Sequence, residues 1–237
     1  MGRNSRLIGA FMKKKLLLLI LGLLNVVYIY ADEKLILEAV NDLFISTLND
    51  RQWALGRSSV LFEQGKDSDF YEWRNLQDSN LNTCWCEGKK DAGIGEYVLI
   101  PFSIEDGLGF SYRKAQRFKN IVCSLNINNG NCKDMESFMK NNRIKRCRIK
   151  VYDTPVIYGQ NITYANSTPL LIYDSSIELE DTPGKQLFEF CIKLRDDETE
   201  CSPLLMIQLI ILDVYPGTQY DNTAISEIKV YGEYVDQ

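Results

Sequence analysis

Residues 75–88 read NLQDSNLNTCWCEG, and residues 224–234, near the other end of the chain, read AISEIKVYGEY. The first stretch is a loop rich in Asp and Asn that leads into a Thr and a Trp. The second alternates apolar and polar residues as a half-buried strand does, yet it holds a carboxylate, Glu227, out of place in that pattern. We expect the two stretches to meet in the folded protein, around either a structural cation or an equivalent set of hydrogen bonds.

Short β-rich runs separated by Gly, Pro, Asn and Asp turns fill the chain from Trp53 onward. Because no long helical pattern separates them, the sequence predicts an all-β antiparallel fold, either a sandwich or a jelly roll. The apolar run at 204–212 is far too short to cross a membrane as a helix and indicates a central strand covered on both faces. The expected strands are 97–102, 118–127, 143–152, 169–173, 187–194, 204–214 and 225–234.

The N-terminus has the pattern of a signal peptide. Lys13–Lys15 precede the apolar run Leu16–Leu24, and the small residue Ala31 offers a cleavage position before the chain turns acidic. We therefore expect residues 1–31 to be removed, with Met12 as an alternative start. The other interpretation is an uncleaved membrane anchor, because the run is close to the length that spans a bilayer.

The remaining chain divides into a short first segment and one large domain. Apolar residues at near-helical spacing predict a short amphipathic helix over 34–49, within a helix and linker segment at 32–52. The β domain is expected to occupy 53–237. If the signal is cleaved, the mature protein is secreted or periplasmic and has no transmembrane domain.

The composition excludes several classes of function. The net charge of −5 and the pI near 5.0 argue against nucleic-acid partners, which are bound by clustered Lys and Arg. The chain contains no histidine, which excludes Ser-His-Asp and Cys-His catalysis and zinc sites that use imidazole. No pair of carboxylates stands out as a catalytic acid and base, so we expect a protein that is not an enzyme.

The seven cysteines follow the apolar segment, at positions 84, 86, 123, 132, 147, 191 and 201. Outside the cytosol some of them would form disulfides, and the local pairs Cys123–Cys132 and Cys191–Cys201 are preferred. Cys84 and Cys86 lie two apart on an expected strand, about 7 Å from each other, which is too far for a relaxed disulfide between them. The alternative is that several cysteines are buried free thiols.

Four stretches occur in an order that resembles a known family: 75–88, GIGEYVLI at 93–100, NNRIK at 141–145 and DVYPGTQYDNTAISEIKVY at 213–231. Together they resemble the discoidin-like domain of the translocation region of bacterial NAD glycohydrolases, a relative of the coagulation factor 5/8 type C and galactose-binding families. The resemblance covers 53–234 and implies a jelly-roll β-sandwich that holds glycans or other surface ligands, sometimes with bound calcium. It does not imply NAD hydrolysis or an NAD cofactor, because the discoidin-like part of such toxins is separate from the catalytic domain.

In the fold that the resemblance implies, the first and last strands lie near each other. Asp78, Asn80 and Thr83 would then sit in a loop into which Glu227 projects, a set of hard oxygens suited to calcium. The alternative is a calcium-free network in which Asp78 caps turn N–H groups and Thr83 bonds the backbone. The family commonly has Gly after the Asp, so Ser79 implies either a different turn or backbone strain.

The candidate ligand-binding residues are Glu87, Tyr215, Tyr220 and Asp221. The last three lie on a loop that contains Pro and Gly, and loops at one end of a sandwich are where such modules hold ligands. Tyr with Asp suits a sugar, because it combines a flat apolar face with a directional acceptor. The alternative is that Asp213 and Asp221 order the turn itself.

Other marked residues have structural interpretations. Trp85 is expected to anchor the core rather than stack on a sugar. Gly93 and Gly95 predict a tight turn and not a phosphate loop, because no strand-loop-helix context follows. Glu96 and Arg143 each open a buried strand and could pair with each other.

The sequence therefore predicts a secreted or periplasmic, non-catalytic binding module that recognises a glycan or another cell-surface ligand. The alternative is a protein-interaction or envelope-scaffolding domain built on the same sandwich.

Overall fold

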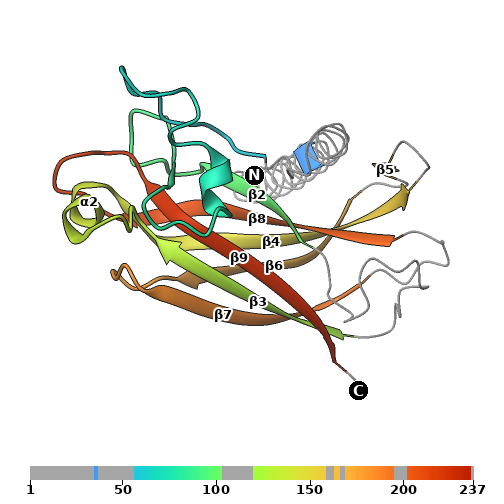
Figure 1. The fold of residues 1–237 in the computed structure, drawn as a ribbon. Helices are drawn as coiled ribbons and strands as arrows, with labels where there is room; N and C mark the ends of the chain where they lie inside the picture. Colours follow the sequence, from blue (N-terminus) through green and yellow to red (C-terminus); the bar gives the residue numbers. More distant parts are fainter. Residues whose placement is uncertain are drawn as a thin grey trace, which may run out of the picture.

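The computed structural model of the chain describes residues 35–36, 56–102, 120–158, 163–165, 169–194 and 202–235. These residues form two antiparallel β-sheets packed face to face, with little helix (Figure 1). The predicted all-β sandwich is therefore confirmed. The elements in chain order are η1 (Trp73–Leu76), β1 (Trp85–Cys86), β2 (Tyr97–Phe102), β3 (Asn120–Asn129), α2 (Met135–Lys140), β4 (Arg143–Tyr158), β5 (Thr163–Ala165), β6 (Leu170–Glu178), β7 (Lys185–Lys193), β8 (Ser202–Tyr215) and β9 (Ala224–Val235).

The order of the strands brings distant parts of the chain together. One sheet has the order β1-β9-β3-β7, so the first strand pairs with the last. The other sheet has the order β2-β8-β4-β5, and β6 also pairs with β4. In this second sheet β8 lies between β2 and β4, and Leu205–Leu209 are buried without interruption. The expectation of a central strand covered on both faces is confirmed for this part of β8.

The core lies between the two sheets and follows from period-two alternation. Along β3, Ile121, Cys123, Leu125 and Ile127 are buried, and the residues between them are half-exposed. They join one apolar cluster with inward-facing residues of β4, β8 and β9. Full burial of each large aliphatic side chain contributes about 1.5–3 kcal/mol to stability, so this alternation supplies the main driving force for the sandwich.

All seven expected strands form, some with shifted ends, and some elements were not expected. β2 has the predicted bounds, 97–102, whereas β4 runs past its expected end at 152. The short strands β1 and β5 and the helix α2 were missed. Of the helix expected over 34–49, only Leu35 and Ile36 lie among the described residues; both are helical, and Ile36 is buried. The signal peptide expected over 1–31 lies outside the described residues, as does the rest of that helix.

No helix within the described ranges is both long and apolar enough to cross a membrane.

The six described cysteines are free thiols. The predicted disulfide Cys123–Cys132 is therefore wrong. Cys123 points into the core early in β3, and the extended strand runs on for six further residues, about 20 Å, before the turn that holds Cys132. Cys201 lies outside the described residues, so the pairing Cys191–Cys201 stays a prediction.

Candidate functional site

The pairing of β1 with β9 positions the loop that immediately precedes β1. Trp85 lies opposite Ile225 and Cys86 lies opposite Ala224. The Trp85 side chain is fully buried in the core, and its Nε1–H donates to the carbonyl oxygen of Ser59 at 3.1 Å. Because Trp85 is anchored in this way, the loop that precedes it is held beside β9.

Asp78, Asn80, Thr83 and Glu227 meet in one hydrogen-bonded group, which we call the clasp. The backbone N–H of Asn80 donates to Asp78 Oδ1 at 2.8 Å and to Glu227 Oε1 at 3.0 Å. The Thr83 hydroxyl donates to Asp78 Oδ2 at 2.6 Å. The structure thus brings together the four residues that the sequence indicated as a cation site.

The second oxygen of Glu227 has no hydrogen-bond donor. Glu227 is only 4% exposed, and its Oε2 lies 3.8 Å from the ammonium of Lys229, beyond hydrogen-bonding distance. Burial, followed by a hydrogen bond with the Asp78 carboxyl, raises the pKa of Glu227 to about 7, although Lys229 acts in the opposite direction. Glu227 therefore takes up a proton more readily than an exposed glutamate does.

The turn of the clasp contains a strained residue. Ser79 has a φ of 62° and is the one residue other than glycine with a positive φ in the described part of the chain. Its hydroxyl accepts a hydrogen bond from Lys229 Nζ at 2.9 Å. Of the two alternatives for Ser79, the structure shows backbone strain, which costs about 1–2 kcal/mol for a residue with a Cβ.

The clasp offers the oxygen ligands that calcium prefers, but few of these ligands are charged. Asp78 and Glu227 are carboxylates, and Thr83 and Asn80 add neutral oxygens of the kind that calcium accepts. Within the described ranges, no three His, Cys, Asp or Glu side chains are grouped so as to hold a metal ion. Calcium in the clasp would therefore depend on the two carboxylates, with carbonyl or water oxygens completing its shell of about six to eight ligands.

Glu87 orders the turn that follows β1. Its Oε1 accepts from the Thr223 N–H at 3.0 Å and its Oε2 accepts from the Lys89 N–H at 2.7 Å. The residue is fully buried, and this burial raises its pKa. Gly93 has a φ of 69°, and a Cβ there would lie 2.7 Å from Glu87 Cγ. Both oxygens of Glu87 are thus used within the protein, and Gly93 allows the turn to pass close to them.

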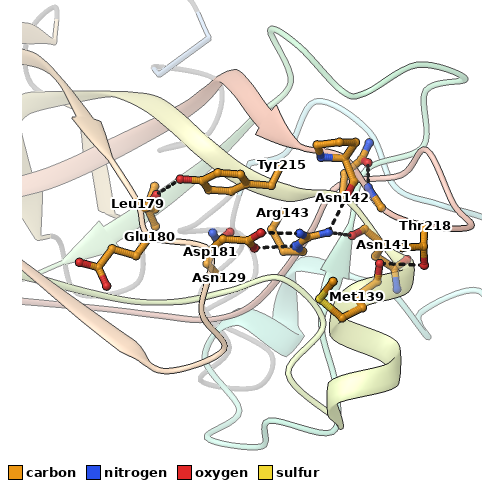
Figure 2. Close-up of polar contacts among 12 residues, drawn as sticks. Asn129, Met139, Asn141, Asn142, Arg143, Leu179, Glu180, Asp181, Tyr215 and Thr218 are labelled. Carbon is orange, nitrogen blue, oxygen red and sulfur yellow. Dashed lines mark hydrogen bonds and ion pairs between the residues drawn. The ribbon is translucent and has the colours of Figure 1, made fainter.

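Arg143 joins three segments at one end of the sandwich (Figure 2). Its Nε and Nη2 donate to the two carboxylate oxygens of Asp181 at 2.9 and 2.7 Å. Its Nη1 donates to the carbonyls of Asn141 and Pro216, both at 3.0 Å. The guanidinium, from a residue only 2% exposed, also lies over the Phe138 ring. Arg143 therefore fixes α2, the β6–β7 turn and the β8–β9 loop relative to one another.

The expected pair between Glu96 and Arg143 does not form. Glu96 accepts hydrogen bonds from the hydroxyls of Ser58, at 2.5 Å, and Ser59, and it pairs with Lys89. The physical reason is the strand order: β8 lies between β2, which Glu96 precedes, and β4, which Arg143 opens. Each charge has a different partner: Glu96 pairs with Lys89, and Arg143 pairs with Asp181.

The β8–β9 loop presents Tyr220 to solvent on a fixed backbone. The Tyr220 N–H donates to the carbonyl of Lys140 at 2.9 Å, and the Asp221 carbonyl accepts from Asn142 Nδ2 at 2.5 Å. The Tyr220 side chain is 45% exposed, and its hydroxyl accepts from Gln219 Nε2 at 3.0 Å. Figure 2 shows the same loop held to α2 at Thr218, whose N–H and hydroxyl both donate to the Met139 carbonyl.

Tyr215 is used differently from Tyr220. Its hydroxyl donates to the Leu179 carbonyl at 3.0 Å, as Figure 2 shows, so the side chain ties the end of β8 to the β6–β7 turn. Of the four residues indicated as ligand-binding, Tyr220 and Asp221 are therefore the exposed ones, whereas Glu87 is buried and Tyr215 is half-buried.

The sequence reasoning missed α2, which lies beside this loop (Figure 1). Asp134 caps the helix by accepting from the Ser137 N–H at 2.6 Å, and Lys140 pairs with Glu136 one turn away. An Asp followed by a Glu–Lys pair at this spacing is the signal that could have identified it. Met135 and Met139, one turn apart, are exposed on its surface.

The two sheets, the β1–β9 pairing and the clasp define a discoidin-like β-sandwich domain. The chain belongs to the family described as the NAD glycohydrolase translocation F5/8 type C domain, whose family model matches residues 51–231. By this description, the family is a translocation domain of the F5/8 type C, or discoidin-like, class. No curated protein matches the chain significantly.

Solved structures show distant similarity. One is the arabinofuranosyltransferase AftD from mycobacteria, with 11% identity and a TM-score of 0.39 over 77% of this chain. The chain covers 11% of the length of AftD. Another is the F5/8 type C domain of a Bacteroides fragilis protein, with 13% identity and a TM-score of 0.37, covering 78% of this chain and 94% of that one.

Proposed function

We propose that the chain is a non-catalytic, secreted or periplasmic binding module that holds a glycan at the end of the sandwich formed by the β8–β9 loop and α2. The observation that supports this proposal is Tyr220, an exposed aromatic ring on a backbone that hydrogen bonds and Arg143 hold in place. We expect no NAD cofactor at this site.

The chemistry around Tyr220 suits a sugar. An aromatic face packs on the apolar face of a pyranose, while Asp221, Gln219 and Lys140 supply acceptors and donors for hydroxyl groups. Because the loop is already ordered by its bonds to α2 and β4, little conformational entropy is lost on binding. A preorganised platform of this kind favours a rigid polar ligand.

A glycan array tests the proposal directly. The expected result is saturable binding that the free sugar competes away and that Tyr220→Ala reduces by tenfold or more, about 1.4 kcal/mol. Tyr231→Ala is the matched control, because Tyr231 is also exposed but lies on β9. Absence of binding on a broad array, or equal loss in both variants, would refute the glycan site at Tyr220.

We propose further that the clasp binds one calcium ion as a structural cofactor. The buried Glu227 Oε2 without a donor and the adjacent Asp78 carboxylate support this proposal. Calcium would favour the ionised form of Glu227, whose pKa is raised in the folded protein. In this role the ion would stabilise the loop and take no part in catalysis.

A second candidate function is protein binding through α2. Met135 is 61% exposed and Met139, one turn further along the helix, is 42% exposed, and flexible Met side chains are common on protein-binding surfaces. The two candidates differ in their response to mutation. Met135→Lys would abolish binding to a protein partner from envelope extracts, whereas it would leave glycan binding at Tyr220 intact.

A further inference from the structure

Strand β7 has an open edge that contains no proline and no bulge. It pairs with β3 over nine residue pairs, from Asn120↔Lys193 to Asn128↔Lys185, without an irregularity in register. Within the described ranges, no strand pairs with its other edge. Proteins commonly block such edges with a proline or a bulge, and β7 has neither, although a lysine stands at each end.

Several apolar side chains next to this edge are incompletely buried. Leu187 is 55% exposed, and Phe188 and Phe190 are only partly buried although they pack against the core. The Phe190 ring stacks on Tyr173 of β6 at 4.4 Å, so β6 and β7 close the core on this side. A strand added to β7 would cover the remaining surface of the two Phe side chains.

We propose that two copies of the chain pair through their β7 edges, antiparallel and around a twofold axis at Cys191. In this register Glu189 lies opposite Lys193 of the second copy, so each interface contains two pairs of opposite charge. On the inner face Phe190 lies opposite Ile192, and Phe188 opposite Leu194. Both of these inward-facing pairs are apolar, and the two four-stranded sheets become one continuous sheet.

Other registers are less favourable. An axis at Glu189 places like charges opposite each other, Glu189 against itself and Lys185 against Lys193, which destabilises the pairing. An axis at Leu187 pairs Lys185 with Glu189, but it sets the polar Gln186 opposite Phe188 on the inner face. Of these three axes, the one at Cys191 combines opposite charges outside with apolar pairs inside.

This register also brings the two Cys191 thiols together. Cys191 is exposed and free, and residues directly opposite in an antiparallel pair have Cα atoms about 4.5–5.5 Å apart, within the range of a disulfide. With oxidised glutathione, one Cys191 thiolate displaces glutathione thiolate to form a mixed disulfide. The second Cys191 thiolate then displaces the other glutathione thiolate from that sulfur, and the two protons released from the Cys191 thiols go to the two glutathione molecules.

The test uses the purified chain. In reducing buffer, sedimentation is expected to show a concentration-dependent dimer. With oxidised glutathione, a non-reducing gel is expected to show a covalent dimer whose peptide map contains a Cys191–Cys191 link. Cys191→Ser removes the covalent dimer and leaves the dimer in reducing buffer.

Charge variants test the register. Glu189→Lys is expected to weaken the dimer about tenfold or more, because it faces Lys193 of the second copy, and Lys193→Glu in the same chain restores it. Glu136→Lys, the same change on α2, is the control and leaves the dimer intact. Three results would overturn the proposal: a monomer at every concentration, a Cys191–Cys201 link within one chain, or a covalent dimer formed by Leu187→Cys in a Cys191→Ser chain when the native chain forms none.

Discussion

The backbone N–H of Asn80 donates a hydrogen bond to Glu227 Oε1 at 3.0 Å, joining residues 147 positions apart in the chain. This bond fixes the loop before β1 against β9, next to the pairing of Trp85 with Ile225. Because the carboxylate of Glu227 is buried beside Asp78, we expect this contact to respond to cations and to protons.

Calcium is expected to raise the melting temperature at pH 8 relative to chelator. An ion that binds only the folded state stabilises it by mass action, by about 2.7 kcal/mol at a hundred times its Kd. Glu227→Gln, which keeps the shape and removes one charged ligand, should abolish the rise, and magnesium is the ionic control. Identical melting with calcium and with chelator would instead favour the calcium-free network.

In chelator, stability is expected to fall as pH rises from about 4.5 to about 8. The pKa of Glu227 is about 7 in the folded protein, above its ordinary value of 4.5, so the folded state binds more protons in this interval. The stabilisation is complete below 4.5 and is lost as pH rises through 7; its size is about 1–3 kcal/mol. Urea denaturation across pH measures it.

Glu227→Gln should flatten this slope, and Glu136→Gln, at an exposed position on α2, should leave it unchanged. A slope that persists in Glu227→Gln would assign the titration to another group.

Ser79→Gly is expected to be more stable than Ser79→Ala by about 1 kcal/mol, because glycine adopts the left-handed φ of 62° without a Cβ penalty. Both variants lose the hydrogen bond from Lys229, so their difference reports the backbone strain reduced by the greater unfolded-state entropy of glycine. Chemical denaturation of the two proteins provides the measurement. Equal stability would mean that the turn changes conformation when the side chain is shortened.

Arg143→Met is expected to cost about 2–4 kcal/mol, since it leaves the carbonyls of Asn141 and Pro216 without donors and Asp181 without its partner. The matched control is Arg148→Met. Arg148 pairs with Asp174 through two bonds of 2.6 Å, but its side chain is 46% exposed, so its loss should cost under about 1 kcal/mol. Comparable losses of stability in the two variants would contradict the conclusion that Arg143 holds three segments together.

The mature N-terminus is expected at Asp32 when the full chain is expressed in a bacterium with an export system. N-terminal sequencing of the extracytoplasmic fraction tests the cleavage after Ala31. A chain that stays in the membrane fraction with its N-terminal segment intact would support the anchor interpretation.

Local pattern was sufficient for much of the fold. Period-two alternation and turn residues predicted strands such as 118–127, because the inward face of each strand must be apolar to form the core. The same pattern missed β1, since two residues are too few to show a period. It also missed α2, whose stability depends on its cap and on the burial of Phe138.

The clasp could be anticipated because its residues are chemically conspicuous: a carboxylate in a strand and an Asp-rich loop. The sequence by itself thus determined the class of fold and the residue types that meet at the clasp. Only the tertiary structure decided which charges pair, because partners such as Arg143 and Asp181 are chosen by strand order and not by spacing along the chain. For the same reason it alone decided that Glu87 is buried while Tyr220 is presented to solvent.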